Sequence, residues 1–96
     1  MKKSAVLVNM ARGAVTDEDA VADAVEHGEI AAFGTDVYSL EPIAQDSPLV
    51  RLYGRENVLF TPHLAWGAYE ARVRCLNEVI LNIKDFIAGG RRNRIV

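Results

Sequence analysis

The chain has 96 residues, half of them hydrophobic and a quarter charged, and its formal net charge is −2. This length forms one small domain, and this composition excludes a disordered chain or a coiled coil. The weakly acidic balance also excludes a global electrostatic field that would attract nucleic acid or an anionic membrane.

The first half of the chain predicts a strand, a helix and a second strand. Residues 4–9 hold a continuous apolar run, which is typical of a central parallel strand covered on both faces. A helix is predicted to begin at Thr16, with Asp19 completing a capping-box-like start, and to end at Gly28. Residues 30–37 then predict the second strand. We expect a strand–helix–strand unit with a right-handed crossover.

The second half predicts a long loop, a third strand and a long helix. Residues 38–56 are irregular, with one short helical turn over residues 49–53, and long loops in compact domains are usually functional. Residues 57–60 predict the third strand, which Pro62 ends because it lacks an amide donor. Apolar residues at helical spacing predict a last helix over residues 67–88. Three short apolar strands separated in this way indicate an α/β layer architecture.

A single cysteine, Cys75, excludes an internal disulfide and any CxxC metal or redox motif. Its place in an apolar helical stretch predicts a buried thiol and a reducing compartment. The apolar run near the start is too short for a secretion signal or a membrane span. We therefore predict a cytoplasmic protein that has no metal site and no membrane partner.

Three polar residues, Arg12, Glu41 and His63, each follow one of the predicted strands. Ligands of α/β sheets bind outside the carboxyl ends of the strands, where these three loops would meet. Taken singly, the residues are also compatible with a surface arginine, a loop carboxylate and a packing or capping histidine. Together they indicate a site.

Each of these three groups suits one task in the reduction of a 2-keto acid. The planar, permanently charged fork of Arg12 fits a carboxylate, and His63 can carry a proton near neutral pH. A carboxylate at Glu41 would fix the tautomer of His63 and favour its imidazolium form, so that the histidine can act as an acid. The three residues are therefore the candidate catalytic group.

Three ordered motifs carry a resemblance to a known family. They are Val-Asn-Met-Ala-Arg-Gly at 8–13, Gly-Thr-Asp-Val-Tyr with Glu-Pro at 34–42, and Thr-Pro-His-Leu-Ala-Trp at 61–66. Together they resemble the carboxy-terminal part of the NAD-binding domain of the D-isomer-specific 2-hydroxyacid dehydrogenases. That family includes phosphoglycerate dehydrogenase, glycerate dehydrogenase and glyoxylate/hydroxypyruvate reductase. The resemblance covers almost the whole chain. It implies the second half of a Rossmann-type doubly wound parallel sheet, with about three strands and a long carboxy-terminal helix.

The resemblance also implies roles for individual residues. Arg12 would bind the carboxylate and carbonyl of the substrate, Glu41 would pair with His63, and His63 would be the acid and base. Asp36 would contact the nicotinamide carboxamide of NAD or NADP. Trp66 is equally compatible with a large core or interface aromatic. The full set of implied cofactor-binding residues is Met10, Asp36, His63, Ala65 and Trp66.

No GxGxxG occurs in the chain, so the pyrophosphate cradle is missing and only the nicotinamide half of NAD(P) could be seated. We expect residues 1–96 to be a partial NAD(P)-binding domain, with residues 67–90 as the helix that leads back to a missing substrate domain. Such a half-domain would expose a sheet edge and apolar faces, which predicts a homo-oligomer; exchange of the last helix between chains is one form that it could take.

Two functions remain open on the sequence. In one, the chain is a fragment of an oxidoreductase that transfers a hydride between NAD(P) and a D-2-hydroxyacid or 2-keto acid, and it is inactive alone. In the other, it is a non-enzymatic, self-associating α/β remnant that binds no dinucleotide. The residues that would distinguish one 2-hydroxyacid from another, or NAD from NADP, lie in parts of the family fold that this sequence does not contain.

Overall fold

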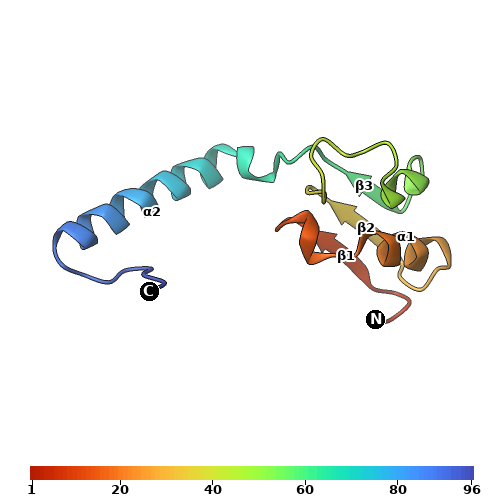
Figure 1. Ribbon diagram of the computed structural model, residues 1–96, viewed down its shortest axis with the longest axis horizontal. Coiled ribbons are helices and arrows are strands. Elements are labelled where there is room, and N and C mark those ends of the chain that lie inside the picture. The colour runs from red at the N-terminus through yellow and green to blue at the C-terminus, as the bar shows by residue number, and fades with distance from the viewer. The chain divides into compact units, whose positions relative to one another are not determined.

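The computed structural model describes residues 1–96, which form two compact units, residues 1–65 and residues 66–96 (Figure 1). The first unit holds three strands, one α-helix and two short 3-10 helices, and the second is built around one long α-helix. In chain order the elements are β1 (Val6–Asn9), η1 (Gly13–Val15), α1 (Glu18–Glu26), β2 (Ala32–Thr35), η2 (Pro48–Leu52), β3 (Val58–Phe60), η3 (Ala65–Gly67) and α2 (Tyr69–Ile87).

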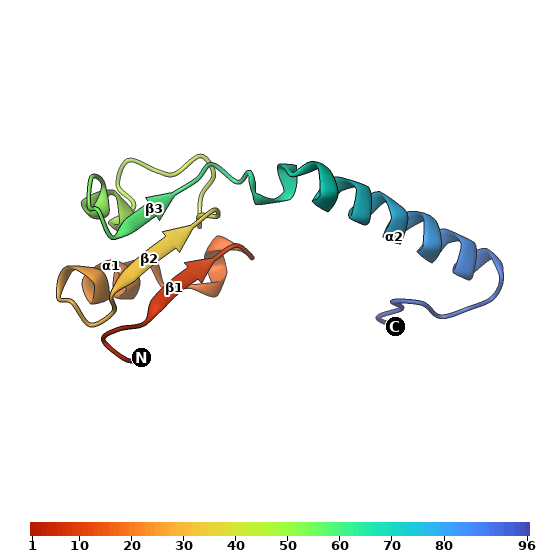
Figure 2. The same cartoon turned by 180° about the vertical axis from the view of Figure 1, so that it is seen from behind.

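The three strands form one parallel sheet in the order β1-β2-β3 (Figure 2). Gly34 at the centre pairs with Val8 on one side and with Leu59 on the other. The fold class predicted from the sequence is therefore confirmed, but the placing of the first strand at the centre is wrong. β1 is an edge strand, and its residues Val6 and Val8 are 61% and 58% exposed. An apolar run shows that a strand suits burial, but it does not show which neighbour provides the cover.

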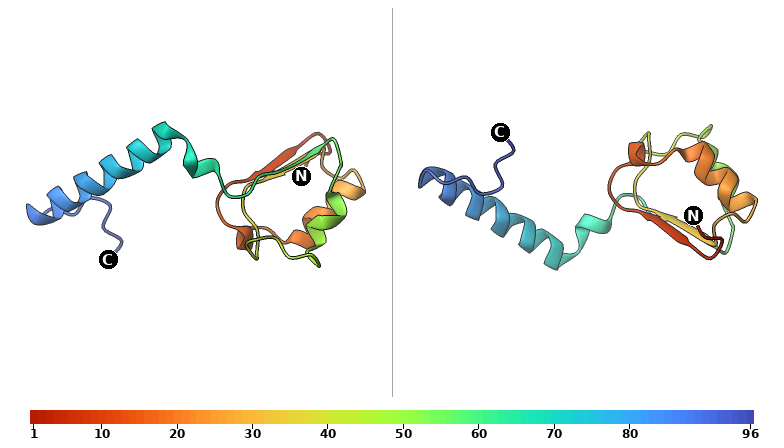
Figure 3. Two further views of the ribbon diagram at one scale, coloured as in Figure 1. Left: turned by 90° about the horizontal axis from the view of Figure 1, so that it is seen from above. Right: turned by 90° about the horizontal axis from the view of Figure 1, so that it is seen from below.

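The core of the first unit lies on one face of the sheet, beneath α1 and η2 (Figure 3). Val21 and Val25 recur at helical spacing along α1, and both are buried against Phe33 of β2. Leu49 and Leu52 of η2 close the other side of this core and are almost fully buried. Each such side chain contributes about 1.5–3 kcal/mol through burial. This packing fixes the sheet and the loops that follow its strands.

The ends of α1 follow the expected chemistry with one correction. Gly28 has a φ of 66°, in the left-handed region that glycine adopts without steric cost, and the helix ends just before it as predicted. At the other end the cap is Asp17, whose carboxylate accepts the amide of Ala20 at 3.1 Å. The predicted cap, Thr16, instead donates its hydroxyl to the carbonyl of Gly13. Because Asp and Thr are both good capping residues, adjacent candidates leave the first turn ambiguous by one position.

The second unit is formed by α2 and the residues that follow it. None of the side chains of α2 is buried, although apolar residues recur along it at helical spacing. Cys75 is exposed, so the predicted burial of its thiol is wrong: an apolar stripe buries its neighbours only where another element packs on it. Gly89, with a φ of 77°, ends the helix as expected. No helix in the structure has the length and apolarity that crossing a bilayer requires.

Candidate functional site

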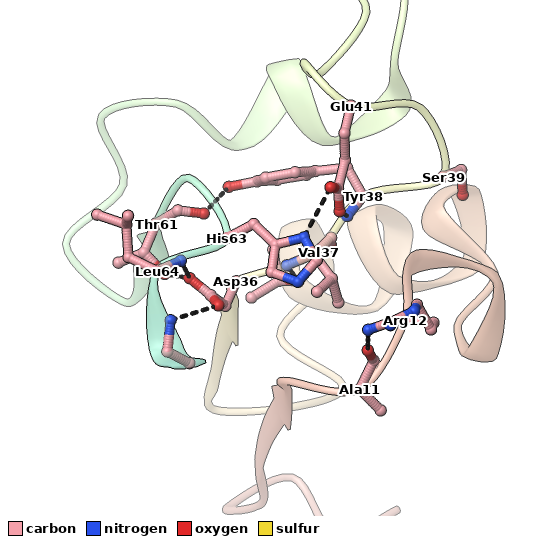
Figure 4. Close-up of polar contacts among 12 residues, drawn as sticks. Ala11, Arg12, Asp36, Val37, Tyr38, Ser39, Glu41, Thr61, His63 and Leu64 are labelled. Carbon is pink, nitrogen blue, oxygen red and sulfur yellow. Dashed lines mark hydrogen bonds and ion pairs between the residues drawn. The ribbon is translucent and has the colours of Figure 1, made fainter. Parts of the chain in front are cut away.

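The loops that follow β1, β2 and β3 carry the predicted catalytic residues, and all three loops belong to the first unit (Figure 4). Arg12 lies three residues after β1, at the start of η1. Glu41 lies in the long loop after β2, and His63 lies three residues after β3. Because parallel strands end at the same edge of their sheet, the fold brings these loops to one edge, as the sequence predicts.

Glu41 and His63 are in direct contact. The Nδ1 atom of His63 lies 2.7 Å from Oε2 of Glu41, and each side chain is about one-third exposed (Figure 4). The other oxygen of Glu41, Oε1, accepts the backbone amide of Tyr38 at 3.1 Å. The hydrogen bond from His63, followed by that from Tyr38, holds the pKa of the Glu41 carboxyl below its usual value.

This geometry determines which ring nitrogen of His63 can do chemistry. An ionised Glu41 only accepts hydrogen bonds, so the proton on the facing side of the ring stays on Nδ1. Nε2 is then the nitrogen that gains or loses a proton, acting as an acid in the imidazolium form and as a base in the neutral form. The predicted pairing of these two residues is present in the structure.

Asp36 is held in a way that the sequence did not reveal. Its buried carboxylate, 4% exposed, accepts the hydroxyl of Thr61 and the backbone amides of Leu64 and Ala65, both at 2.8 Å. The hydrogen bond from Thr61 is the main cause that lowers the pKa of Asp36. These three donors flank His63, whose backbone has a φ of 55°. Asp36 therefore fixes the loop that carries the histidine.

Three of the predicted cofactor-binding residues line one pocket. Met10, Asp36 and Ala65 surround a space of about 410 Å³ whose remaining wall is largely apolar. The full lining is Val8, Met10, Gly34, Thr35, Asp36, Leu59, Thr61, Leu64 and Ala65. Oδ2 of Asp36 accepts only one of the three hydrogen bonds, and a carboxylate oxygen can accept two. The pocket thus combines apolar walls with one remaining acceptor.

His63 lies at a neighbouring pocket of about 460 Å³, which it lines together with Glu41. Aromatic and proline side chains form most of the wall of this pocket. They are Tyr38, Pro42, Tyr53, Phe60 and Pro62. The hydroxyl of Tyr38 donates to the carbonyl of Thr61 at 2.8 Å, which ties the loop after β2 to the loop after β3. Sequence reasoning gave Tyr38 no role, and its place between Asp36 and Glu41 in the second motif was the only signal.

The remaining two predicted residues, Arg12 and Trp66, are both exposed. Arg12 is exposed, and its guanidinium donates to the carbonyl of Ala11 in its own loop at 2.8 Å (Figure 4). Its positive charge is nevertheless among the causes that lower the pKa of Glu41. Trp66 belongs to the second unit and is 62% exposed. Both roles remain predictions from the sequence motifs.

Comparison with known proteins matches this chain to one family. The sequence profile of the D-isomer specific 2-hydroxyacid dehydrogenase, NAD binding domain, matches residues 1–65. The chain is 37% identical over 93 residues to the hydroxypyruvate reductase of Blautia hydrogenotrophica, a match that covers 97% of this chain and 28% of that protein. It is 43% identical over 89 residues to the glyoxylate reductase of Korarchaeum cryptofilum, covering 93% of this chain and 26% of that protein.

A solved structure shows the same likeness in three dimensions. An acyclic imino acid reductase in complex with NADPH and D-Arg superposes with a TM-score of 0.76 and 35% sequence identity, over 100% of this chain and 29% of that one. The chain thus spans less than a third of the length of each of these proteins.

Proposed function

Because the chain belongs to the family of D-isomer specific 2-hydroxyacid dehydrogenases, through its NAD-binding domain, we propose that it forms part of an oxidoreductase. The reaction is hydride transfer between NAD or NADP and a D-2-hydroxyacid or its 2-keto acid. The observation that carries this proposal is the contact of 2.7 Å between His63 and Glu41, beside a pocket lined by Asp36, Met10 and Ala65.

The pocket fits the nicotinamide half of NAD(P). Apolar walls around Val8, Met10 and Leu59 suit a flat aromatic ring, and the remaining acceptor capacity of Asp36 suits the N–H groups of the carboxamide. When bound, the nicotinamide supplies or accepts the hydride. The adenosine half has no counterpart here, because the 96 residues contain no GxGxxG. These residues would therefore hold the reacting end of the cofactor only.

The side chains of the site then divide the remaining work. In reduction, Nε2 of the His63 imidazolium donates a proton to the carbonyl oxygen of the substrate, and in oxidation the neutral ring removes that proton. Glu41 keeps the other ring nitrogen protonated and stabilises the imidazolium. Arg12 binds the substrate carboxylate and stabilises the negative charge that develops on the carbonyl oxygen. Glyoxylate and hydroxypyruvate appear in the names of the two relatives and are therefore the first substrates to test.

A second candidate function rests on the missing phosphate cradle and on the open face of the sheet. Without a seat for the pyrophosphate, the chain would lack most of the binding energy for a dinucleotide. In that case it is a self-associating α/β remnant without catalysis. Val6, Val8 and Leu59 are exposed on one face of the sheet, and burying them between two copies of the chain would favour such self-association.

A ligand titration separates the two candidates. We expect reduced nicotinamide mononucleotide to shift the amide resonances of Leu64 and Ala65, because these amides hold Asp36 at the pocket. ADP-ribose, which lacks the nicotinamide, is the matched control and should leave both resonances in place. The same samples are assayed with NADH or NADPH and glyoxylate or hydroxypyruvate. No shift with any nicotinamide compound, together with no turnover, would support the remnant.

The assembly is the remaining part of the proposal. We propose that residues 1–96 form a partial NAD(P)-binding domain, with residues 67–90 as a helix leading to a substrate domain, and that the chain is a cytoplasmic homo-oligomer. Support comes from the exposed Val6 of the edge strand β1 and from the many exposed apolar residues of α2. Light scattering after size-exclusion chromatography should give at least twice the chain mass of 10.6 kDa. A monodisperse monomer would rule out the oligomer.

A further inference from the structure

The backbone of Tyr38 and Ser39 lies at the centre of a support for Glu41. Two successive backbone amides donate to two different carboxylates: Tyr38 donates to Oε1 of Glu41 at 3.1 Å, and Ser39 donates to Oε1 of Glu18 at 2.7 Å. Glu18 lies in the first turn of α1, 21 residues earlier than Ser39. The amide of Tyr38 belongs to the Val37–Tyr38 peptide and that of Ser39 to the next peptide, so the carboxylate that faces His63 is linked through the backbone of Tyr38 to a carboxylate on a packed helix.

Gly13 holds the same peptide from another side. A Cβ atom on residue 13 would overlap the carbonyl carbon and oxygen of Tyr38 and the amide nitrogen of Ser39. Only glycine allows backbone to approach backbone this closely, and Gly13 is buried. Because Gly13 directly follows Arg12, this contact joins the loop after β1 to the loop after β2.

Glu18 also holds the far end of the loop that contains Glu41. Its second oxygen, Oε2, accepts the hydroxyl of Ser47 at 2.9 Å, and the oxygen of Ser47 in turn accepts the amide of Leu49 at the start of η2. One half-buried side chain thus fixes both Ser39 and Ser47. Residues Val21, Ala22 and Val25 of α1 are buried in the core between the helix and the sheet, and this packing holds the helix that carries Glu18.

We propose that Glu18 and Gly13 are positioning residues that hold Glu41 against His63. The proposal rests on the proposed function to the extent that the Glu41–His63 pair is the proton-transfer pair. Gly13 and Glu18 contact the Tyr38–Ser39 peptide, and their effect passes through the backbone of Tyr38 to its amide, then to Glu41, and from Glu41 to Nδ1 of the histidine.

The test measures the tautomer of His63, which a purely structural role of Glu18 would not change. The ¹⁵N chemical shifts of the ring report whether Nδ1 or Nε2 carries the proton. In the unaltered chain, we expect Nδ1–H to dominate in the neutral ring. In Glu18→Ala the loop is released, and we expect this dominance to be lost. His27, whose Nδ1 contacts the carbonyl of Asp23, serves as the internal reference and should not change.

Two further variants control the result. Glu18→Gln keeps an oxygen that can accept the amide of Ser39 and gains an NH₂ group that can donate to Ser47, so it should retain the tautomer of the unaltered chain. Asp19→Ala removes the same charge from the same turn of α1. Its only ion pair is a weak contact of 3.8 Å with Arg51, so it should have no effect. An unchanged His63 tautomer in a folded Glu18→Ala variant would overturn the proposal.

Should Glu18→Ala fail to fold, Ser47→Ala is the second variant: it removes the hydrogen bond to Oε2 of Glu18 and the acceptor of the Leu49 amide, but leaves the bond from Ser39 to Oε1 in place. A smaller change in the same direction supports the proposal, and no change overturns it. The readout requires neither cofactor nor turnover. A loss of the tautomer preference without any nicotinamide binding would refute the proposed function and leave the positioning role standing. Nicotinamide binding together with an unchanged His63 tautomer in Glu18→Ala would support the proposed function and refute the positioning role.

Discussion

If the chain serves the proposed hydride transfer, replacing His63 with asparagine should lower the rate of glyoxylate or hydroxypyruvate reduction in a preparation containing the chain by roughly a hundred-fold or more. Asparagine tolerates the positive φ of 55° at this position, so the backbone of the loop is kept while the group that carries the proton is lost. The loss should appear in kcat as well as in kcat/KM, because the proton moves in the transition state and not in substrate binding. Steady-state kinetics with NADH and NADPH measure both constants.

His27→Asn is the matched control for this variant. The chain has two histidines, and His27 lies at the end of α1, where its Nδ1 contacts the carbonyl of Asp23 at 2.8 Å. Its replacement should leave kcat within a factor of about two, since surface changes away from a site have small effects. An equal loss in both variants would indicate damage to the fold. Full activity in His63→Asn would remove His63 from the mechanism.

Replacing Asp36 with asparagine lowers the midpoint of thermal unfolding of the first unit by roughly 5–10 °C. The change keeps the shape of the side chain but turns one acceptor into a donor. If the remaining oxygen keeps Thr61 and Leu64, the new NH₂ group faces the amide of Ala65, and two buried donors then oppose each other. Circular dichroism followed with temperature gives the midpoint. Hydrogen exchange at Leu64 and Ala65 should also become faster.

The same variant changes the response of the chain to acid. The pKa of Asp36 is lowered in the folded chain, first by its hydrogen bond with Thr61, and that of Glu41 is lowered by His63. A lowered carboxyl pKa contributes stability that is present above the unfolded value of about 4 and is lost as the pH falls through the folded value. The unaltered chain should therefore lose stability below about pH 4. Asp36→Asn should show a shallower loss, since Glu41 still titrates.

Asp46→Asn is the control for both measurements, because Asp46 is an exposed carboxylate in the loop before η2. It should leave both the thermal midpoint and the slope below pH 4 unchanged. A drop in midpoint for Asp46→Asn as large as that for Asp36→Asn would show that the loss of any carboxylate has this effect. The hydrogen bonds that Asp36 accepts around His63 would then contribute no more to the stability of the fold than an exposed carboxylate does.

Local patterns in the sequence were sufficient to predict the three strands and the loops that follow them. Apolar runs marked the strands, and Gly28 marked the end of α1, because both signals depend on near neighbours in the chain. Arg12, Glu41 and His63 were found because each follows a strand, and parallel strands end at one edge. The contact between Glu41 and His63 followed from the same reasoning and is present at 2.7 Å.

Features that depend on distant neighbours could not be predicted in this way. The task of Asp36 as an acceptor for Leu64 and Ala65 spans nearly thirty residues, and no periodicity marks such a pair. The exposure of Cys75 depends on whether another element packs against α2, which its own pattern of apolar residues does not state. The support of Tyr38 by Gly13 is visible only once both backbones are placed. In each case the sequence did not show which distant part of the same chain contacts the residue.

The left-handed backbone at His63 also bears on what the residue at position 63 costs the fold. A side chain held at a φ of 55° costs folding energy that glycine would not, and asparagine adopts this conformation at least as readily. Folding alone therefore gives no reason for a histidine at this position. What the imidazole adds is the contact of its Nδ1 with Glu41 at 2.7 Å.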